Sequence, residues 1–265
     1  MNMLGFQIHP YGILLALAFA GGIGLGVFHG KRLGITPERI IDLAIVFMFS
    51  AMFGSRALYI ILYPHQFESV WSWFALTRGG LVFYGGFLAT TASVVLFGLY
   101  HRISLRTLGD LIAPCLALGH TVGRLGCFAN GCCYGAPTKL PWGCTFSTAG
   151  DVLARHPTQL YEAVFLFAAL VTTHVLLMKR GTAGKPTAGF IWGGYMTSYG
   201  LFRFMVEYLR DDDRGGFFTP LHLSISQLVG LGAVAAGLIW LFICARRAPP
   251  TAPTGLSGTN GAITT

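Results

Sequence analysis

Two arginines lie inside apolar stretches of this sequence. Arg56 and Arg203 are each flanked by hydrophobic residues, and a cation at the centre of a membrane costs roughly 2.5–3.5 kcal/mol on insertion scales. Glu207 lies one helical turn after Arg203 and Tyr199 one turn before it, so the three share a helix face. For Arg56 we favour an internal structural partner. For Arg203 we favour an anion site over an internal ion pair, because a guanidinium grips phosphate with a fork of donors.

The densest cluster of unusual residues is the run from Gly119 to Gly135. Repeated glycines permit tight turns and the close approach of backbone to a ligand, and Arg124 and His120 lie among them. Backbone N–H groups together with the guanidinium predict a site for a headgroup phosphate. A merely irregular loop is the alternative, which glycines alone do not exclude.

Two shorter segments carry further polar residues. In the first, from Arg155 to Glu162, Thr158 after a proline indicates a helix start. His156 beside it is interpreted as a surface residue at this cap, although a histidine at such an edge can also exchange protons. In the second, from Arg78 to Gly86, paired glycines on each side let other groups crowd against Tyr84.

Four cysteines lie in one polar segment: Cys127, Cys132, Cys133 and Cys144. We predict that they form one or two disulfides, as expected in an oxidising compartment. The spacing C-x4-C-C-x10-C lacks the usual C-x2–4-C pairs of zinc sites, so we predict no metal. A free thiol that acts as a local nucleophile or acceptor is the remaining alternative.

Composition identifies the solvent that surrounds these residues. The 265 residues are 54% hydrophobic and 11% charged, with a mean hydropathy of +0.62, whereas a soluble domain carries about 25% charged residues. The excess of apolar surface indicates a lipid environment. The net charge is +8, but no basic stripe carries interleaved aromatics, so nucleic acid is not an expected partner. No cleavable signal peptide is visible, because the first ten residues lack a cationic region.

The elements that position the polar residues are expected to be membrane-spanning helices. A span needs about 20 mostly apolar residues. Seven stretches qualify, and the fourth is the weakest because Pro114 interrupts it: Tyr11–Phe28, Ile40–Tyr63, Leu81–Tyr100, Leu108–Leu125, Leu160–Met178, Phe190–Leu209 and Leu223–Ala245. The predicted fold is therefore an all-α polytopic membrane protein with seven transmembrane helices in one domain, residues 1–247.

Orientation follows from the cations in the connections. Lys and Arg are more frequent in the connections that follow the first, third, fifth and seventh stretches, and the richer side is cytoplasmic. The N-terminus is then outside and the C-terminus cytoplasmic. Residues 126–159 become a small periplasmic segment, and the uncharged tail, residues 248–265, is predicted to be a disordered cytoplasmic end.

Four motifs, in order along the chain, resemble the prolipoprotein diacylglyceryl transferase family. The family pattern Gly-Arg-x-Gly-Asn-Phe-x-Asn-Gly-Glu-x-x-Gly is similar to Gly123 through Gly135, and His-Pro-Ser-Gln-Leu-Tyr-Glu to His156 through Glu162. Gly-Tyr-Gly-x-x-Arg-Phe-x-x-Glu resembles Thr197 through Glu207, and Tyr11-Gly12 matches a pair in the family's first helix. The similarity extends from Tyr11 to about Gln227.

The resemblance implies an enzyme of the bacterial inner membrane. It would transfer a diacylglyceryl group from phosphatidylglycerol to the cysteine thiol of a prolipoprotein signal peptide, without a cofactor. A thiolate displaces glycerol phosphate, so the site needs a thiol activator and cations around the phosphate. The resemblance implies Arg124 and Arg203 as phosphate-binding catalytic residues. It implies a lipid-positioning set of Tyr11, Asn130, Gly135, Tyr199, Glu207, Gly85 and Gly86.

The sequence departs from the family pattern at three positions. Tyr84 replaces the histidine of a His-Gly-Gly triplet, and Cys127 and Cys132 replace an asparagine and a glutamate. In one hypothesis transfer survives, with His120 or His156 as the base or with Tyr84 ionised by Arg78. In a second the fold is kept and the acceptor chemistry has changed. A third, a non-catalytic lipid-binding or transport protein, is disfavoured because the polar residues gather at one end of the helices.

Overall fold

The fold is taken from a computed structural model. It describes residues 2–3, 6–7, 10–67, 71, 73, 79–180, 188–210, 217–218 and 223–246, with the side chains of 2–11, 217 and 218 excepted. The predicted disordered tail, 248–265, and Arg78 lie outside the described residues.

Seven α-helices account for most of the described chain. They are α1 (Pro10–Arg32), α2 (Pro37–Leu62), α3 (Phe83–Tyr100), α4 (Leu105–Ala129), α5 (Thr158–Met178), α6 (Phe190–Val206) and α7 (Ile225–Arg246). Short 3-10 turns occur at η1 (Pro64–Gln66), η4 (Ser147–Ala149) and η5 (Glu207–Leu209). Two small antiparallel ribbons pair β1 (Asn2–Met3) with β2 (Phe6–Gln7) and β3 (Phe217–Phe218) with β4 (Leu223–Ser224). The all-α prediction is confirmed.

Six of these helices are long and apolar enough to cross a membrane, which makes the chain a multi-pass membrane protein. The helix left out of that group is α6, whose 17 residues fall short of the roughly 20 that a span needs. Its continuation as η5 carries helical backbone to Leu209, the end predicted for the sixth stretch. The large apolar residues on the helix surfaces, such as Leu17, Phe53 and Leu96, are exposed and suited to contact lipid.

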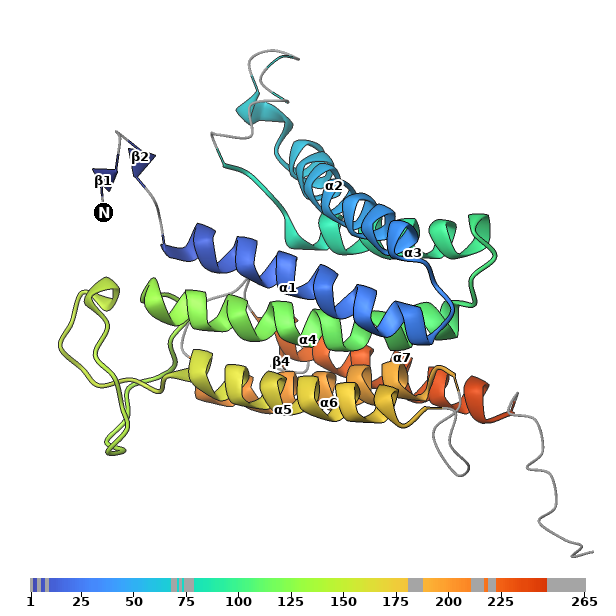
Figure 1. The fold of residues 1–265 in the computed structure, drawn as a ribbon. Helices are drawn as coiled ribbons and strands as arrows, with labels where there is room; N and C mark the ends of the chain where they lie inside the picture. The colour runs from blue at the N-terminus through green and yellow to red at the C-terminus, as the bar shows by residue number, and fades with distance from the viewer. Residues whose placement is uncertain are drawn as a thin grey trace, which may run out of the picture.

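The helices are arranged around α1 and α4, which lie side by side through the middle of the bundle (Figure 1). The α2–α3 hairpin lies on one side of this pair, and α5, α6 and α7 lie on the other. The long connection between α4 and α5 projects from the end of the bundle at which α1 begins (Figure 1). The elements that carry the polar motifs therefore meet at one end of the bundle.

Helix α4 is longer than the sequence predicts at both ends. It begins at Leu105 and continues to Ala129 through Pro114, which is buried inside it. A proline removes one backbone hydrogen bond, but the packing of α4 against α1, α5 and α6 holds the helix continuous. As a result Gly126 and Cys127 belong to the last turn of α4 and not to the connection in which the sequence analysis placed them.

The opposite end of the bundle contains one buried carboxylate. Asp110 of α4 is fully buried and accepts hydrogen bonds from the backbone N–H groups of Gly189, at 2.7 Å, and Trp192, at 2.9 Å. Arg180 forms an ion pair with it at 3.2 Å. The first N–H groups of a helix lack partners within the helix, so Asp110 caps α6 from a neighbouring helix.

Candidate active site

Glu162 is the centre of the polar cluster at the end of the bundle that carries the long connection. It lies in α5, one turn after the helix begins, and is 1% exposed. Its Oε2 lies 2.6 Å from Nη2 of Arg124 in α4, and its Oε1 accepts a hydrogen bond of 3.1 Å from Nη1 of Arg210. One buried carboxylate therefore holds two guanidinium groups from different parts of the chain.

A second ion pair lies beside the first. Arg203 donates from Nη1 to Oε2 of Glu207 at 2.6 Å, one helical turn along the chain. The other oxygen of Glu207 accepts a hydrogen bond of 2.8 Å from the hydroxyl of Ser224. Both side chains of the pair are about 10% exposed. The internal ion pair, which the sequence made the less favoured reading of Arg203, is therefore present, and it does not exhaust the donors of this guanidinium.

Tyr199 connects the two ion pairs. Its side chain interacts with Arg124 and with the charges of Arg203 and Glu162. Arg124 and Arg203 are the two residues expected to act on one phosphate, and the charges of both act on Tyr199. Three arginines and two glutamates make up this cluster, so it carries an excess of one positive charge: Arg124, Arg203, Arg210, Glu162 and Glu207.

The connection between α4 and α5 is held against this cluster by its backbone. Gly135 donates its N–H to the carbonyl of His156 at 2.8 Å and pairs with Arg210 in an isolated antiparallel bridge. A Cβ atom at Gly135 would meet the carbonyl oxygen of Leu209 and lie 2.8 Å from Thr158 Cγ2. The absence of a side chain at Gly135 is thus what allows Arg210 to approach Glu162.

The two histidines predicted as alternative bases occupy different places. His120 lies one turn before Arg124 in α4; its ring is 5.6 Å from that of Tyr199, and its Nδ1 lies 3.2 Å from the Tyr195 hydroxyl. His156 lies in the connection, and its Nδ1 is 3.2 Å from the hydroxyl of Tyr161. The ring of His120 therefore contacts Tyr199, whereas that of His156 contacts Tyr161.

The residues of the Tyr84 segment occupy another part of the bundle. Tyr84 is 41% exposed on α3 and its ring contacts Phe83. Gly85 and Gly86 are buried at the crossing of α2 and α3, where a Cβ atom on either would overlap α2. None of the hydrogen bonds, ion pairs or ring contacts between described residues joins Tyr84 to Arg124 or Arg203.

Two other predicted residues, Asn130 and Arg56, have simpler surroundings. Asn130 ends α4 as its C-cap and is exposed. The side chain of Tyr11 lies outside the described residues, although its backbone belongs to the first turn of α1. Arg56 is buried and donates to the carbonyl oxygens of Trp73, at 2.8 Å, and Gly79, at 2.6 Å. Its charge is met by the backbone of the segment before α3, in agreement with a structural partner.

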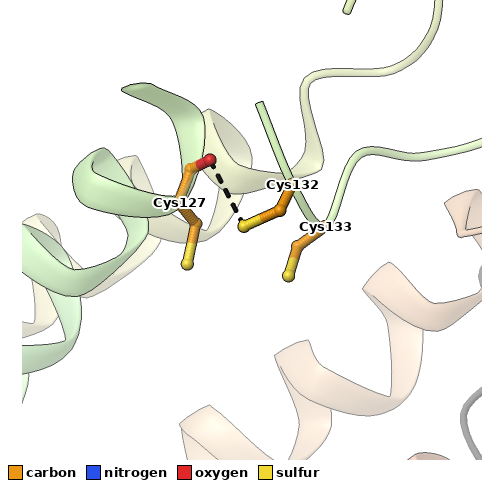
Figure 2. A group of neighbouring side chains, drawn as sticks. All are labelled: Cys127, Cys132 and Cys133. Atoms are coloured by element: carbon orange, nitrogen blue, oxygen red, sulfur yellow. Dashed lines mark hydrogen bonds between the residues drawn. The ribbon is translucent and has the colours of Figure 1, made fainter. Parts of the chain in front are cut away.

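All four cysteines of the polar segment lie among the described residues, and the structure forms none of the predicted disulfides between them. Cys127, Cys132 and Cys133 face one another where α4 ends (Figure 2). Cys144 belongs to a different part of the connection, where its backbone pairs with Arg155.

Two members of the cluster were not predicted as site residues. From the sequence, Glu162 was only the last residue of a helix start and of a family motif, and Arg210 was not singled out. For Glu162 the signal was available, because a carboxylate within an apolar helix requires a partner. For Arg210 no local signal distinguishes it from the charged residues around it, since its role depends on the bridge with Gly135.

Comparison with known proteins finds sequences that are similar over most of the chain. The sequence model of the family described as prolipoprotein diacylglyceryl transferase matches residues 1–243. Proteins named phosphatidylglycerol–prolipoprotein diacylglyceryl transferase are similar over most of their length. That of Bordetella bronchiseptica is 34% identical over 245 residues, which cover 89% of this chain and 90% of the relative. That of Clostridium tetani is 32% identical over 240 residues, 89% and 93% of the two chains. That of Nostoc sp. is 31% identical over 266 residues, 93% and 90%.

Proposed function

The chain belongs to the prolipoprotein diacylglyceryl transferase family, and we propose that its arginine cluster around Glu162 binds the phosphate of the lipid donor. The activity is the transfer of a diacylglyceryl group from phosphatidylglycerol to a prolipoprotein. The donor is then the headgroup phosphodiester of phosphatidylglycerol, and the acceptor is the cysteine thiol of the prolipoprotein signal peptide.

The observation that carries the phosphate assignment is that Arg124 and Arg203 are each held by a glutamate, and that the charges of both act on Tyr199. The cluster keeps an excess of positive charge in a largely buried place, where each electrostatic interaction is stronger than in water. Glu162 fixes Arg124 by one guanidinium nitrogen, and Glu207 fixes Arg203 in the same way. The remaining N–H groups of both side chains can then donate to phosphate oxygens without further ordering.

The reaction needs these donors on the leaving group. The acceptor thiolate attacks the glyceryl carbon, a C–S bond forms, and the C–O bond to phosphate breaks. The electron pair leaves with glycerol phosphate, whose added negative charge the two guanidinium groups stabilise. The thiol proton must go to a base, because the thiolate is the nucleophile.

We assign the role of base to His120. Its Nδ1 contacts the Tyr195 hydroxyl; in the tautomer in which Nδ1–H donates to that hydroxyl, Nε2 is the atom that takes up a proton. It shares a face of α4 with Arg124, one turn away, and therefore stands beside the proposed phosphate site. His156 contacts Tyr161 on the connection, and Tyr84 lies on α3. Both therefore have less support than His120 for the role of base.

The position of the cluster also fits the proposed orientation. It lies at the end of the bundle where the long α4–α5 connection projects (Figure 1). With the N-terminus outside and the C-terminus cytoplasmic, this end faces the periplasm, and the donor enters from the outer leaflet of the inner membrane. A cysteine introduced at position 142 tests this orientation. The double variant Trp142→Cys, Cys144→Ser is treated in intact cells with a thiol reagent that does not cross the membrane. Labelling only after cell lysis would contradict it.

The assignment of the phosphate site is tested by two alanine variants in an assay with phosphatidylglycerol and a peptide that carries the prolipoprotein cysteine. Arg124→Ala and Arg203→Ala should each lower turnover by on the order of 10²–10³-fold, as the loss of a preorganised donor does. Arg180→Ala is the matched control, because this arginine is also paired with a buried carboxylate but lies at the opposite end. Turnover near that of the wild type in both variants would refute the site.

The assignment of the base is tested separately. His120→Ala should lower turnover by about 10²–10⁴-fold, the usual contribution of acid–base catalysis, whereas His156→Ala should leave most of it. A stronger loss in His156→Ala than in His120→Ala would reverse the assignment and leave the phosphate site standing.

A further inference from the structure

Three thiols converge where α4 ends and the connection to α5 begins. Cys127 lies in the last turn of α4, and Cys132 and Cys133 follow the turn at Gly131. Their sulfur atoms all lie within 4.8 Å of one another, and the three residues are partly buried. Figure 2 shows the sulfurs of Cys127 and Cys133 pointing the same way, with that of Cys132 between them. The transfer reaction as derived above uses none of them.

The backbone of this cluster is fixed from α5. The hydroxyl of Thr158 donates to the carbonyl of Cys133 at 3.0 Å, and the amide of Gln159 donates to that of Cys132 at 2.7 Å. Both donors are fully buried. In addition, Cys132 donates its N–H to the carbonyl of Cys127 at 3.1 Å. The thiols are therefore presented from a scaffold that is ordered before any ligand binds, which is how metal sites achieve affinity.

The backbone conformation of Cys133 also indicates that this cluster is held in place. Its φ is +66°, a left-handed conformation that is uncommon for residues other than glycine. Such a conformation costs of order 1–3 kcal/mol and persists where surrounding contacts determine it. Here the contact from Thr158 holds the carbonyl of Cys133, and the result is a thiol directed towards Cys127.

We propose that Cys127, Cys132 and Cys133 form a three-coordinate thiolate site for Cu(I). Thiolates are the ligands that soft cations such as Cu(I) select. Zn(II) in structural sites is almost always four-coordinate, and no histidine or carboxylate among the described residues joins the group. On binding, each thiol loses its proton to solvent, three Cu–S bonds form, and neither copper nor sulfur changes its oxidation state.

The geometry needs only a small adjustment. A metal–sulfur bond of about 2.3 Å places three sulfurs in a plane about 4 Å apart. The sulfurs are already within 4.8 Å, so a rotation of side chains suffices. The charge of Arg124 acts on Cys127, one turn away, and partly offsets the negative charge of the three thiolates. A bound cation would tie the start of the connection to the helix that carries Arg124.

Direct binding is the first test. Reduced protein in detergent micelles is titrated anaerobically with Cu(I) in competition with bathocuproine disulfonate. The wild type should take up one equivalent, and Cys127→Ser and Cys133→Ser should each lose affinity by more than about 100-fold, since even the loss of an outer-shell partner costs 10–100-fold. Cys144→Ser is the matched control and should bind as the wild type does. Equal affinity in all four proteins, or tighter binding of Zn(II) than of Cu(I), would overturn the proposal.

A second test uses the unmodified chain, so it does not depend on the folding of variants. The protein with and without one equivalent of Cu(I) is alkylated with N-ethylmaleimide, and each cysteine is followed by peptide mass spectrometry. Cu(I) should slow the labelling of Cys127, Cys132 and Cys133 by at least about tenfold and leave Cys144 unchanged. Labelling of the three at the same rate with and without Cu(I) would overturn the proposal, as would a disulfide between any two of them in protein purified under anaerobic conditions without reductant.

Discussion

Among the described residues, one fully buried carboxylate lies at each end of the bundle, and the two have different partners. Asp110 accepts two backbone N–H groups of α6 and one side chain, Arg180. Glu162 instead forms an ion pair with Arg124 and accepts a hydrogen bond from the guanidinium of Arg210. The Asp110 site contains one positive and one negative side chain, whereas the Glu162 cluster contains one arginine more than its glutamates.

This difference separates a structural charge from a functional one. The oxygens of a carboxylate that caps a helix accept hydrogen bonds from the main chain, which cannot move without unfolding the helix. A carboxylate that holds only side chains positions them, and the donors they have left remain available to a ligand. Burial alone does not distinguish the two cases, because both carboxylates are almost fully buried.

The largest expected change in stability tests the Asp110 end. Asp110→Ala leaves Arg180 and the N–H groups of α6 without their acceptor, so we expect a loss of about 3–5 kcal/mol in the free energy of unfolding. The turnover of the protein that remains folded should change little. Unfolding in mixed micelles and specific activity of the monodisperse fraction are the measurements, with Asp42→Ala, at an exposed aspartate of α2, as the control. If Asp110→Ala were as stable as the wild type, the contrast between the Asp110 site and the Glu162 cluster would not hold.

The second prediction concerns Glu162, where we expect activity to fall more than stability. Glu162→Gln keeps the size of the side chain but removes the charge that fixes Arg124 and Arg210. The loss of a charge-assisted hydrogen bond is worth about 1.5–3 kcal/mol, so kcat/KM should fall by roughly 10–100-fold. The loss of turnover should be larger than the loss of stability explains. In Asp110→Ala, by contrast, stability should fall and turnover should change little. If turnover and stability fall in proportion, Glu162 is a structural residue like Asp110.

A third prediction concerns the approach of Arg210 to Glu162. Gly135→Ala places a methyl group against the backbone of Leu209, and such overpacking costs about 1–3 kcal/mol. Both the melting temperature and turnover should drop. Gly119→Ala is the control, since its Cβ meets nothing within 4 Å and it lies in a helix. That control should stabilise the protein by about 0.5–1 kcal/mol. Gly135→Ala with the activity of the wild type would show that the bridge does not position the cluster.

The smallest effect belongs to a charge pair outside both sites. The guanidinium of Arg155, which donates to Asp151 at 2.6 Å, holds the pKa of that carboxyl below its ordinary value of 3.8. Its contribution to stability is therefore present above pH 3.8 and is lost as the pH falls through the lower pKa of the folded state. In melting curves from roughly pH 6 to pH 3, Asp151→Asn should show a shallower acid decline than the wild type. Identical curves would show that the pair is energetically silent.

The fold was predictable because lipid imposes a simple pattern. An apolar run of about 20 residues has few alternatives to a helix in a membrane, and all seven predicted stretches contain one. The errors lie at the ends. Helix α4 continues through Pro114 to Ala129 because neighbouring helices stabilise it, and a local pattern does not contain that information.

The candidate site was predictable in part. Arg124 and Arg203 stand out because cations near lipid require a reason, and the structure joins them through Tyr199. The spacing of the cysteines suggested disulfides, whereas the structure groups three thiols without a disulfide and leaves Cys144 apart. The pairing of thiols depends on where the chain turns after α4, at Gly131, and spacing does not specify that turn.

By itself the sequence determined the membrane environment, the helices and the family, since each follows from composition, from apolar periodicity or from short motifs. Only the tertiary structure decided which charges share a partner. Glu162, Arg124 and Arg210 are separated along the chain by up to 86 positions, and they meet because α4, α5 and the end of α6 pack at one end of the bundle. Electrostatic interactions act through a few ångströms of space, and the packing of helices sets those distances.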